Sequence, residues 1–299
     1  MTDVRRVAGA GVGLALERWG GDARGPALLM LHGVSRCGRG FAGLLPPLLP
    51  RFDVHTLDHR GHGASDRAAS YLVRDYAADC IAVVERELSG PVVLQGHSLG
   101  SLVALLVAAA LPGRVKALVL EDPPGPAFLA GVSRSDYAAL FGLYRRHAGS
   151  PLPVGELARV LADAELTGAS GPPRRFGAIR DAAGVRFTAA CLGRVDPAVF
   201  APLLSDAWLE SVDLLEAARR VVCPVLLLRA DPALGGMLPD GDVAALVAAL
   251  GDVAVIDFSA GSPWGRAGHG ILGQAPEAMA RFVIPFLEST SVADRGGAA

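Results

Sequence analysis

Short, continuous apolar runs alternate with segments of helical periodicity at both ends of this sequence. The strand-like runs fall within residues 12–20, 26–33, 52–63, 91–96, 115–124, 221–230 and 253–260. The helix-like segments fall within residues 75–88, 99–113, 242–251 and 276–290. Runs that are apolar throughout are typical of parallel strands buried on both faces, and helices connect such strands. The sequence therefore predicts an α/β fold, with a mostly parallel sheet and helices on both of its faces.

The middle of the chain breaks this alternation, because it contains no convincing buried strand. Helical i, i+3, i+4 and i+7 spacing of apolar side chains occurs there at Tyr137, Leu140, Phe141 and Tyr144. A second helical pattern covers residues 155–166. We therefore predict a core domain of residues 1–123 and 221–290, a helical insertion of residues 124–220, and a disordered tail of residues 291–299.

Composition narrows the functional classes. Apolar residues make up 51% of the 299 residues, charged residues make up 19%, and the formal net charge is −2. These values predict a globular fold and argue against nucleic acid or an anionic membrane as partner. The four cysteines show no CxxC spacing, which argues against a zinc site or a disulfide framework. Because we find no apolar run long enough for a signal peptide or a bilayer span, we expect a cytoplasmic protein.

The stretch "GHSLG" at residues 96–100 follows one apolar run and opens the next helical pattern. This is the context of a nucleophile elbow, a sharp strand-to-helix turn that exposes a serine. Such a turn holds its serine at positive φ and has no room for side chains two residues before or after it. Gly96 and Gly100 meet that requirement. We therefore interpret Ser98 as a catalytic nucleophile.

A serine nucleophile needs a base and donors for an oxyanion. Of the seven histidines, His269 lies in an Ala-Gly-His-Gly loop between the last predicted strand and the last helix, where the base of this arrangement is expected. The predicted oxyanion donors are the backbone N–H groups of Leu99, next to the serine, and Val34, in the loop after residues 26–33. His32 is expected to brace that loop rather than to react.

Together these residues resemble a known family. The stretches are "LHG" at residues 31–33, "DHRGHGAS" at 58–65, "GHSLG" at 96–100 and "AGHGI" at 267–271. In this order they resemble the signature stretches of the α/β-hydrolase fold superfamily, in its capped serine hydrolase branch of esterases and lactonases. The resemblance implies a Ser–acid–His triad, no cofactor and a cleft between the sheet and a helical cap at residues 124–220. It also implies that "DHRGHG" is a structural loop, so we predict no metal site there.

The sequence offers two aspartates as the acid of the triad. The usual family position, after the strand that follows the cap, is occupied by Ala233, and Asp231 lies two residues too early. Asp122 follows the strand after the nucleophile helix, a position from which some relatives take their acid. We favour Asp122 and keep Asp231 as the alternative. Glu121 should point to the opposite face of a regular strand.

The predicted function is hydrolysis of an ester or lactone bond in a small, largely apolar substrate through an acyl-enzyme. The alternatives are a carbon–carbon bond hydrolase with the same triad and a non-catalytic ligand-binding protein. The candidate substrate-binding residues are Gly33, His97, Phe128, Tyr137, Phe141 and Trp264. We find no evident arginine pair in the cap for a substrate carboxylate. The only partner that we predict is a small-molecule substrate, and a homodimer is compatible with the sequence.

Overall fold

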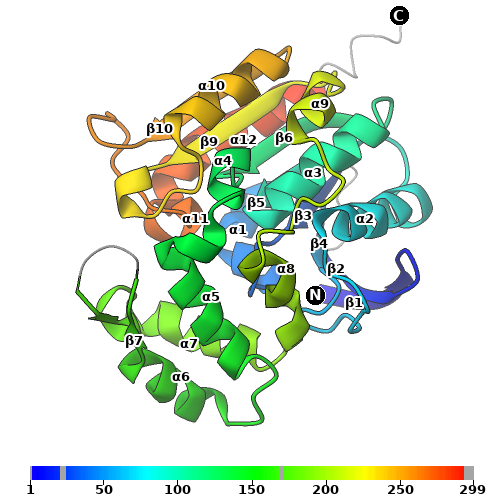
Figure 1. Ribbon diagram of the computed structural model, residues 1–299. Helices are drawn as coiled ribbons and strands as arrows, with labels where there is room; N and C mark the ends of the chain where they lie inside the picture. Colours follow the sequence, from blue (N-terminus) through cyan, green and yellow to red (C-terminus); the bar gives the residue numbers. More distant parts are fainter. Residues whose placement is uncertain (1, 21–24, 169–171, 293–299) are drawn as a thin grey trace, which may run out of the picture.

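An eight-stranded sheet forms the centre of the computed structural model, which describes residues 2–20, 25–168 and 172–292 (Figure 1). Its strands, named in chain order, are β1 (Thr2–Ala8), β2 (Gly13–Trp19), β3 (Ala27–Leu31), β4 (Asp53–Asp58), β5 (Val92–His97), β6 (Val115–Glu121), β9 (Val225–Ala230) and β10 (Val253–Phe258). Their order across the sheet is β1-β2-β4-β3-β5-β6-β9-β10. Only the β1–β2 and β2–β4 pairs of this sheet are antiparallel. The predicted, mostly parallel sheet is confirmed.

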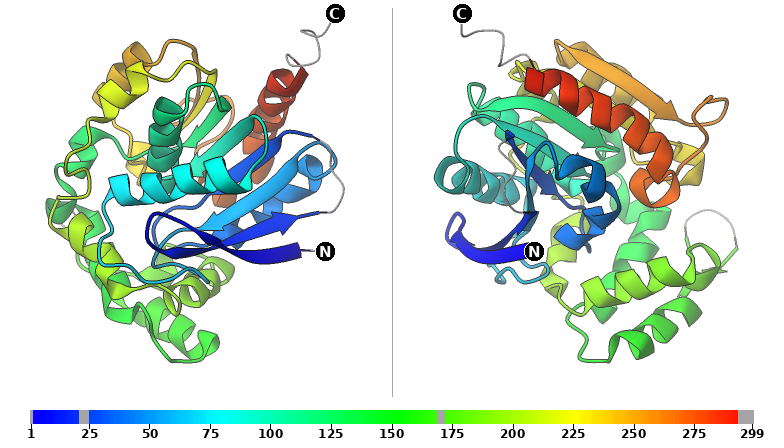
Figure 2. Two further views of the ribbon diagram at one scale, coloured as in Figure 1. Left: turned by 90° about the vertical axis from the view of Figure 1, so that its right-hand side faces the viewer. Right: turned by 180° about the vertical axis from the view of Figure 1, so that it is seen from behind.

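Helices cover both faces of the sheet (Figure 2). One apolar cluster packs beneath α2 (Val73–Glu87), α3 (Leu99–Ala110) and α10 (Asp240–Ala249). A second cluster packs beneath α1 (Leu45–Leu48), α11 (Ile271–Gln274) and α12 (Pro276–Val292). Burial on both faces is why the strand segments are apolar throughout, since neither face of a central strand meets water.

The central strand β5 positions Ser98. β5 pairs with β3 on one side and β6 on the other, and its residues Val92–Gly96 are all buried. β5 ends at His97 and α3 begins at Leu99, so a single residue connects them. The carboxyl ends of parallel strands share one edge of a sheet, and ligands of open α/β sheets bind at that edge. Ser98 therefore lies at the middle of the edge where a ligand site is expected.

The chain between β6 and β9 forms mainly helices. They are α4 (Pro126–Leu129), α5 (Asp136–His147), α6 (Val154–Asp163), α7 (Ala182–Leu192), α8 (Ala201–Leu204) and α9 (Leu214–Arg219). Two-residue strands β7 (Glu165–Leu166) and β8 (Arg174–Arg175) form a small antiparallel ribbon beside them. In Figure 1 the α5, α6 and α7 helices form a separate layer below the sheet. In contrast, α9 packs against α3 and α10.

Two features of the chain ends differ from the sequence prediction. β1 was not predicted, because Asp3, Arg5 and Arg6 interrupt any apolar run, yet it pairs with β2 along its whole length. Helix α12 continues to Val292, into the segment predicted as a disordered tail, and the remainder of that tail lies outside the described residues.

Two further observations concern the cysteines and the membrane. All four cysteines are free, and the Sγ atoms of Cys37, in the loop after β3, and Cys191, in α7, lie 3.7 Å apart. Within the described ranges no single helix is long and apolar enough to cross a membrane. One pair, Ala182–Leu192 with Pro197–Leu204, reaches that length only together and is bent by 110°.

Candidate active site

Ser98 occupies a strained backbone conformation between β5 and α3. Its φ is 55° and its ψ is −117°, values that few residues with a Cβ adopt. A Cβ added to Gly96 would lie 2.2 Å from the carbonyl oxygen of Gly100, and one added to Gly100 would lie 1.9 Å from that of Leu31. Both glycines are therefore required for the close approach of β5, α3 and β3 that forms this turn.

The loop after β3 faces Ser98 across the same cavity. Val34 lines that cavity, and it follows Gly33, where an added Cβ would lie 3.1 Å from the Cβ of Ser98. The loop is held by the N–H of Ser35, which donates to Nε2 of His62 at 3.2 Å. In the part of the chain that the structure describes, the N–H groups of Val34 and Leu99 donate to no other residue. Both groups are thus free to donate to a ligand.

His269 lies in the loop between β10 and α11, and it pairs with Asp122. Its Nδ1 lies 2.7 Å from Oδ2 of Asp122, a carboxylate at the end of β6 with no exposed surface. Backbone N–H groups of Ala230 and Met237 also donate to this carboxylate, at 3.1 and 2.8 Å. Because a carboxylate only accepts, the Nδ1 of His269 carries a proton and Nε2 remains available as a base.

Asp231 has different partners. Its Oδ2 accepts from Nε of Arg266 at 2.6 Å, and its Oδ1 accepts from the N–H of Ala233 at 2.8 Å. The hydrogen bond with Arg266 is the largest cause that lowers the pKa of Asp231. No hydrogen bond joins Asp231 to His269, although both residues are described. This carboxylate starts a short 3₁₀ helix over Pro232–Leu234 and anchors the segment that leads to His269.

Two further histidines fix the loops of the site. Nδ1 of His32 lies 2.8 Å from the carbonyl oxygen of Gly33, and its Nε2 accepts from the N–H of His59 at 3.0 Å. Burial lowers the pKa of His32 to about 4, so the ring is neutral at pH 7, as one donor and one acceptor nitrogen require. His97 holds the loop of the candidate base, because its Nε2 lies 3.0 Å from the carbonyl oxygen of His269.

A cavity of about 580 Å³ brings these residues together between the sheet edge and the helical layer. Of the residues predicted from the sequence, it is lined by Ser98, His269, Gly33, Val34, His97, Tyr137 and Phe141. Two of the candidate substrate-binding residues, Phe128 and Trp264, do not line the cavity. Phe128 packs behind Tyr137, with ring centroids 5.3 Å apart, and Trp264 is 44% exposed and packs on Phe282.

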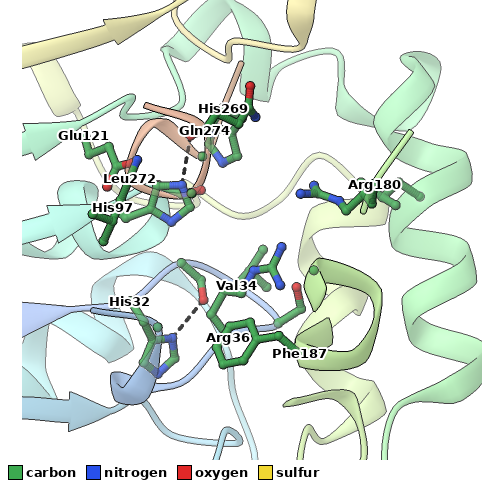
Figure 3. Close-up of a pocket in the computed structure, with 18 of the residues that line it drawn as sticks. His32, Val34, Arg36, His97, Glu121, Arg180, Phe187, His269, Leu272 and Gln274 are labelled. Atoms are coloured by element: carbon green, nitrogen blue, oxygen red, sulfur yellow. Dashed lines mark hydrogen bonds between the residues drawn. The ribbon is translucent and has the colours of Figure 1, made fainter. Parts of the chain in front are cut away.

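Four arginine or acidic residues of the lining were not predicted as site residues, namely Arg36, Glu121, Arg180 and Asp181. Arg36 lies in the loop after β3, Arg180 precedes α7, and both border the cavity (Figure 3). Glu121 also borders it and accepts from the N–H of Leu272 at 2.8 Å, and burial raises its pKa to about 8. Arg36 could have been noticed from its place three residues after Gly33. No sequence pattern distinguishes Arg180.

The "DHRGHG" loop serves as structural support. Oδ1 of Asp58 accepts from the N–H of Gly38 at 2.8 Å, and the His59 and His62 rings pack around His32. Among the described residues, no group of three or more His, Cys, Asp or Glu side chains could hold a metal ion.

Comparison with known proteins agrees with this architecture. A family model described as the alpha/beta hydrolase fold matches residues 26–149. Lipase LipV of Mycobacterium tuberculosis is 39% identical over 113 residues, which cover 38% of this chain and 42% of that protein. The 2-(acetamidomethylene)succinate hydrolase of Mesorhizobium japonicum is 35% identical over 99 residues, which cover 33% of this chain and 36% of that protein.

The similarity to solved structures extends over nearly the whole chain. A crystal structure of E-2-(acetamidomethylene)succinate hydrolase superposes with a TM-score of 0.74 at 22% identity and covers 96% of this chain and 100% of its own. This likeness shows that the chain has the α/β-hydrolase fold. The chain spans about two fifths of the length of the curated relatives that it matches.

Proposed function

We propose that this chain is a serine hydrolase that cleaves an ester or lactone bond through Ser98, Asp122 and His269. One observation carries the proposal. The imidazole of His269 is hydrogen-bonded to the buried carboxylate of Asp122 at 2.7 Å, and His269 borders the same cavity as the strained Ser98. A serine hydroxyl is a weak nucleophile until a base accepts its proton, and that base needs an orienting partner. In this arrangement His269 can accept the proton of Ser98, and Asp122 can orient His269.

In the proposed reaction, Oγ of Ser98 attacks the acyl carbon while Nε2 of His269 accepts its proton. The negative charge on the former carbonyl oxygen accepts hydrogen bonds from the N–H groups of Leu99 and Val34. Asp122 stabilises the imidazolium, which then donates its proton to the leaving group. A water molecule, deprotonated by His269, attacks the acyl-enzyme, and the product acid leaves as Ser98 regains its proton.

Asp122 is the proposed acid because its carboxylate has no exposed surface and is held by two backbone N–H groups. These hydrogen bonds fix the carboxylate in place without a cation beside it. Asp231 already has Arg266 as its partner. Ser98 and His269 share no hydrogen bond in the described part of the chain, and this bond is often long in the absence of substrate. We expect it to shorten when an acyl group occupies the cavity.

The cavity supports a small organic substrate. Its helical side is formed by Tyr137, Leu140, Phe141 and Phe187, which suit an apolar substrate body. Its volume of about 580 Å³ lies within the ordinary range of small-molecule sites. Two relatives are named a lipase and a hydrolase, which agrees with hydrolysis here.

A direct test is hydrolysis of 4-nitrophenyl valerate by the full-length protein and by Ser98→Ala. We expect turnover with a burst of 4-nitrophenol, because an activated ester acylates Ser98 faster than water removes the acyl group. The Ser98→Ala variant should lose about 10³-fold or more in kcat. Equal turnover by both proteins would contradict the assignment. Absence of turnover by correctly folded protein, across ester and lactone substrates, would instead favour a ligand-binding protein.

A further inference from the structure

Two guanidinium groups face the candidate active site from opposite sides. Arg36 reaches into the cavity from the loop after β3, and Arg180 reaches into it from the helical layer (Figure 3). Both influence groups of the site. The charge of Arg36 is one cause that lowers the pKa of His32 and of His97, after burial as the main cause. Burial raises the pKa of Tyr137, and the charge of Arg180 counteracts this effect.

Neither guanidinium forms an ion pair with a carboxylate among the described residues. Nη1 of Arg36 donates to the hydroxyl of Thr188 at 2.9 Å, and Arg180 lies over the ring of Phe176 at 6.0 Å. Their two positive charges therefore remain uncompensated by a direct partner. Cations that are partly removed from water gain most from an anion that accepts their hydrogen bonds.

The carboxyl groups that border the cavity do not act as anionic partners of Arg36 and Arg180. Glu121 is buried against Leu272, and its raised pKa of about 8 keeps it largely protonated at pH 7. Asp181 is exposed and accepts from the N–H of Gly184 at 2.6 Å, where it caps the start of α7. The lining thus offers an excess of positive charge to a bound ligand.

Arg36 is held ready for such a ligand. Its guanidinium carbon lies 5.7 Å from the ring centroid of Phe187, and the Thr188 hydroxyl that accepts its hydrogen bond donates in turn to the carbonyl oxygen of Gly184. Stacking and one fixed hydrogen bond restrict a side chain that otherwise loses considerable entropy on binding. Its remaining N–H groups stay available for a planar acceptor.

We propose that the substrate carries a carboxylate that binds between Arg36 and Arg180, so that the hydrolysed bond belongs to a carboxylated ester or lactone. This inference rests on the proposed function and refines its substrate class. An arginine fork matches the two oxygens of a carboxylate, and two forks fix the direction of the substrate as well as its charge. The aromatic side chains of the helical layer then contact the apolar part of the same molecule.

Two matched pairs of esters test the proposal. In the first pair, mono-4-nitrophenyl glutarate is compared with 4-nitrophenyl valerate, which has a methyl group where the glutarate has its carboxylate. In the second pair, 4-carboxyphenyl valerate is compared with 4-carbamoylphenyl valerate, so that the charge lies on the leaving group. We expect kcat/KM to favour the charged ester of at least one pair by about 10-fold or more. That preference should fall as ionic strength rises.

The variants Arg36→Gln and Arg180→Gln should each reduce the charged-to-neutral ratio of kcat/KM by about 10-fold. The ratio is measured within one protein preparation, so partial misfolding cancels. Arg39→Gln is the matched control, because Arg39 is exposed, pairs with Glu17 at 3.6 Å and does not line the cavity. It should retain the wild-type ratio.

The two proposals fail differently. Ser98-dependent turnover with no preference for the charged ester of either pair, or a preference that survives both arginine substitutions, overturns the carboxylate site and leaves the hydrolase assignment standing. Absence of Ser98-dependent turnover for all four esters and for lactone substrates overturns both.

Discussion

The position and partners of the Asp122 carboxylate are set by residues from distant parts of the chain. The φ of Asp122 is 41°, an unusual value for a residue with a side chain, and this residue turns the chain at the end of β6. In that position its two oxygens meet Ala230, Met237 and His269. The order of residues along the chain made both Asp122 and Asp231 acceptable as acids. The hydrogen bonds of Asp122 join segments more than 100 residues apart, and they cannot be read from the spacing of residues along the sequence.

The two aspartates can be compared directly. Asp122→Asn should lower kcat by about 10³- to 10⁴-fold, because an amide next to His269 no longer stabilises the imidazolium and can favour the wrong tautomer. Asp231→Asn removes one partner of Arg266, and we expect less than a 10-fold change in kcat. Steady-state hydrolysis of 4-nitrophenyl valerate measures both. A large loss confined to Asp231→Asn would show that the acid has been assigned to the wrong residue.

The raised pKa of Glu121 predicts how the free energy of unfolding depends on pH. Burial raises its pKa from 4.5 to about 8 in the folded protein. Between these pH values the folded state binds a proton that the unfolded state has released, so the free energy of unfolding falls as pH rises from about 5 to 8. Glu121→Gln removes this titration and keeps an oxygen that can accept from Leu272. Its urea midpoint should therefore decline less than that of the wild type over this range, and parallel declines in the two proteins would contradict the assignment.

At the scale of elements, the β5–α3 unit follows closely from its sequence. An apolar run, two glycines around a serine and a second apolar run predict a strand, a tight turn and a buried helix, and the structure contains all three. The reason is local, because the contacts that require glycine lie within the turn or against the adjacent strand β3. In contrast, β1 is held by its pairing with β2 and not by any pattern of its own.

The tightness of this turn can be measured. An alanine Cβ at position 100 would lie 1.9 Å from the carbonyl oxygen of Leu31, so Gly100→Ala must displace α3 or β3. We expect Tm to fall by more than about 5 °C, in the range that overpacking of a core gives for a chain of this size. Gly113→Ala is the control, since an added Cβ there meets nothing within 4 Å, and its free energy of unfolding should change by about 0.5 kcal/mol or less. Thermal denaturation that fails to separate the two variants would contradict this packing.

For the whole molecule, the limits of sequence analysis lie where the helical layer meets the sheet. The periodicity of α5 and α6 predicted those helices, whereas α7 mixes small and large side chains without a clear apolar stripe and was missed. The cavity takes Arg36 from one layer and Arg180 from the other. Because this pairing arises only from the docking of the two layers, the sequence indicated a largely apolar substrate and no arginine pair.

One contact between the two layers offers a matched pair of variants. The hydroxyl of Tyr137 in α5 donates to the carbonyl oxygen of Gly235, whereas the buried hydroxyl of Tyr144 in the same helix has no partner among the described residues. Tyr137→Phe should lower the free energy of unfolding by about 1 kcal/mol, and Tyr144→Phe should leave it unchanged or raise it. Urea denaturation of the two variants measures this difference. Equal effects would show that the Tyr137 contact does not hold the layers together.

The most direct test of the central claim is covalent labelling of the full-length protein by a fluorophosphonate, followed by peptide mass spectrometry. The account predicts a single adduct on Ser98, lost in Ser98→Ala and formed much more slowly in His269→Ala, because the hydroxyl then lacks its base. Correctly folded protein that takes up no label at Ser98, or labels equally fast without His269, would contradict it.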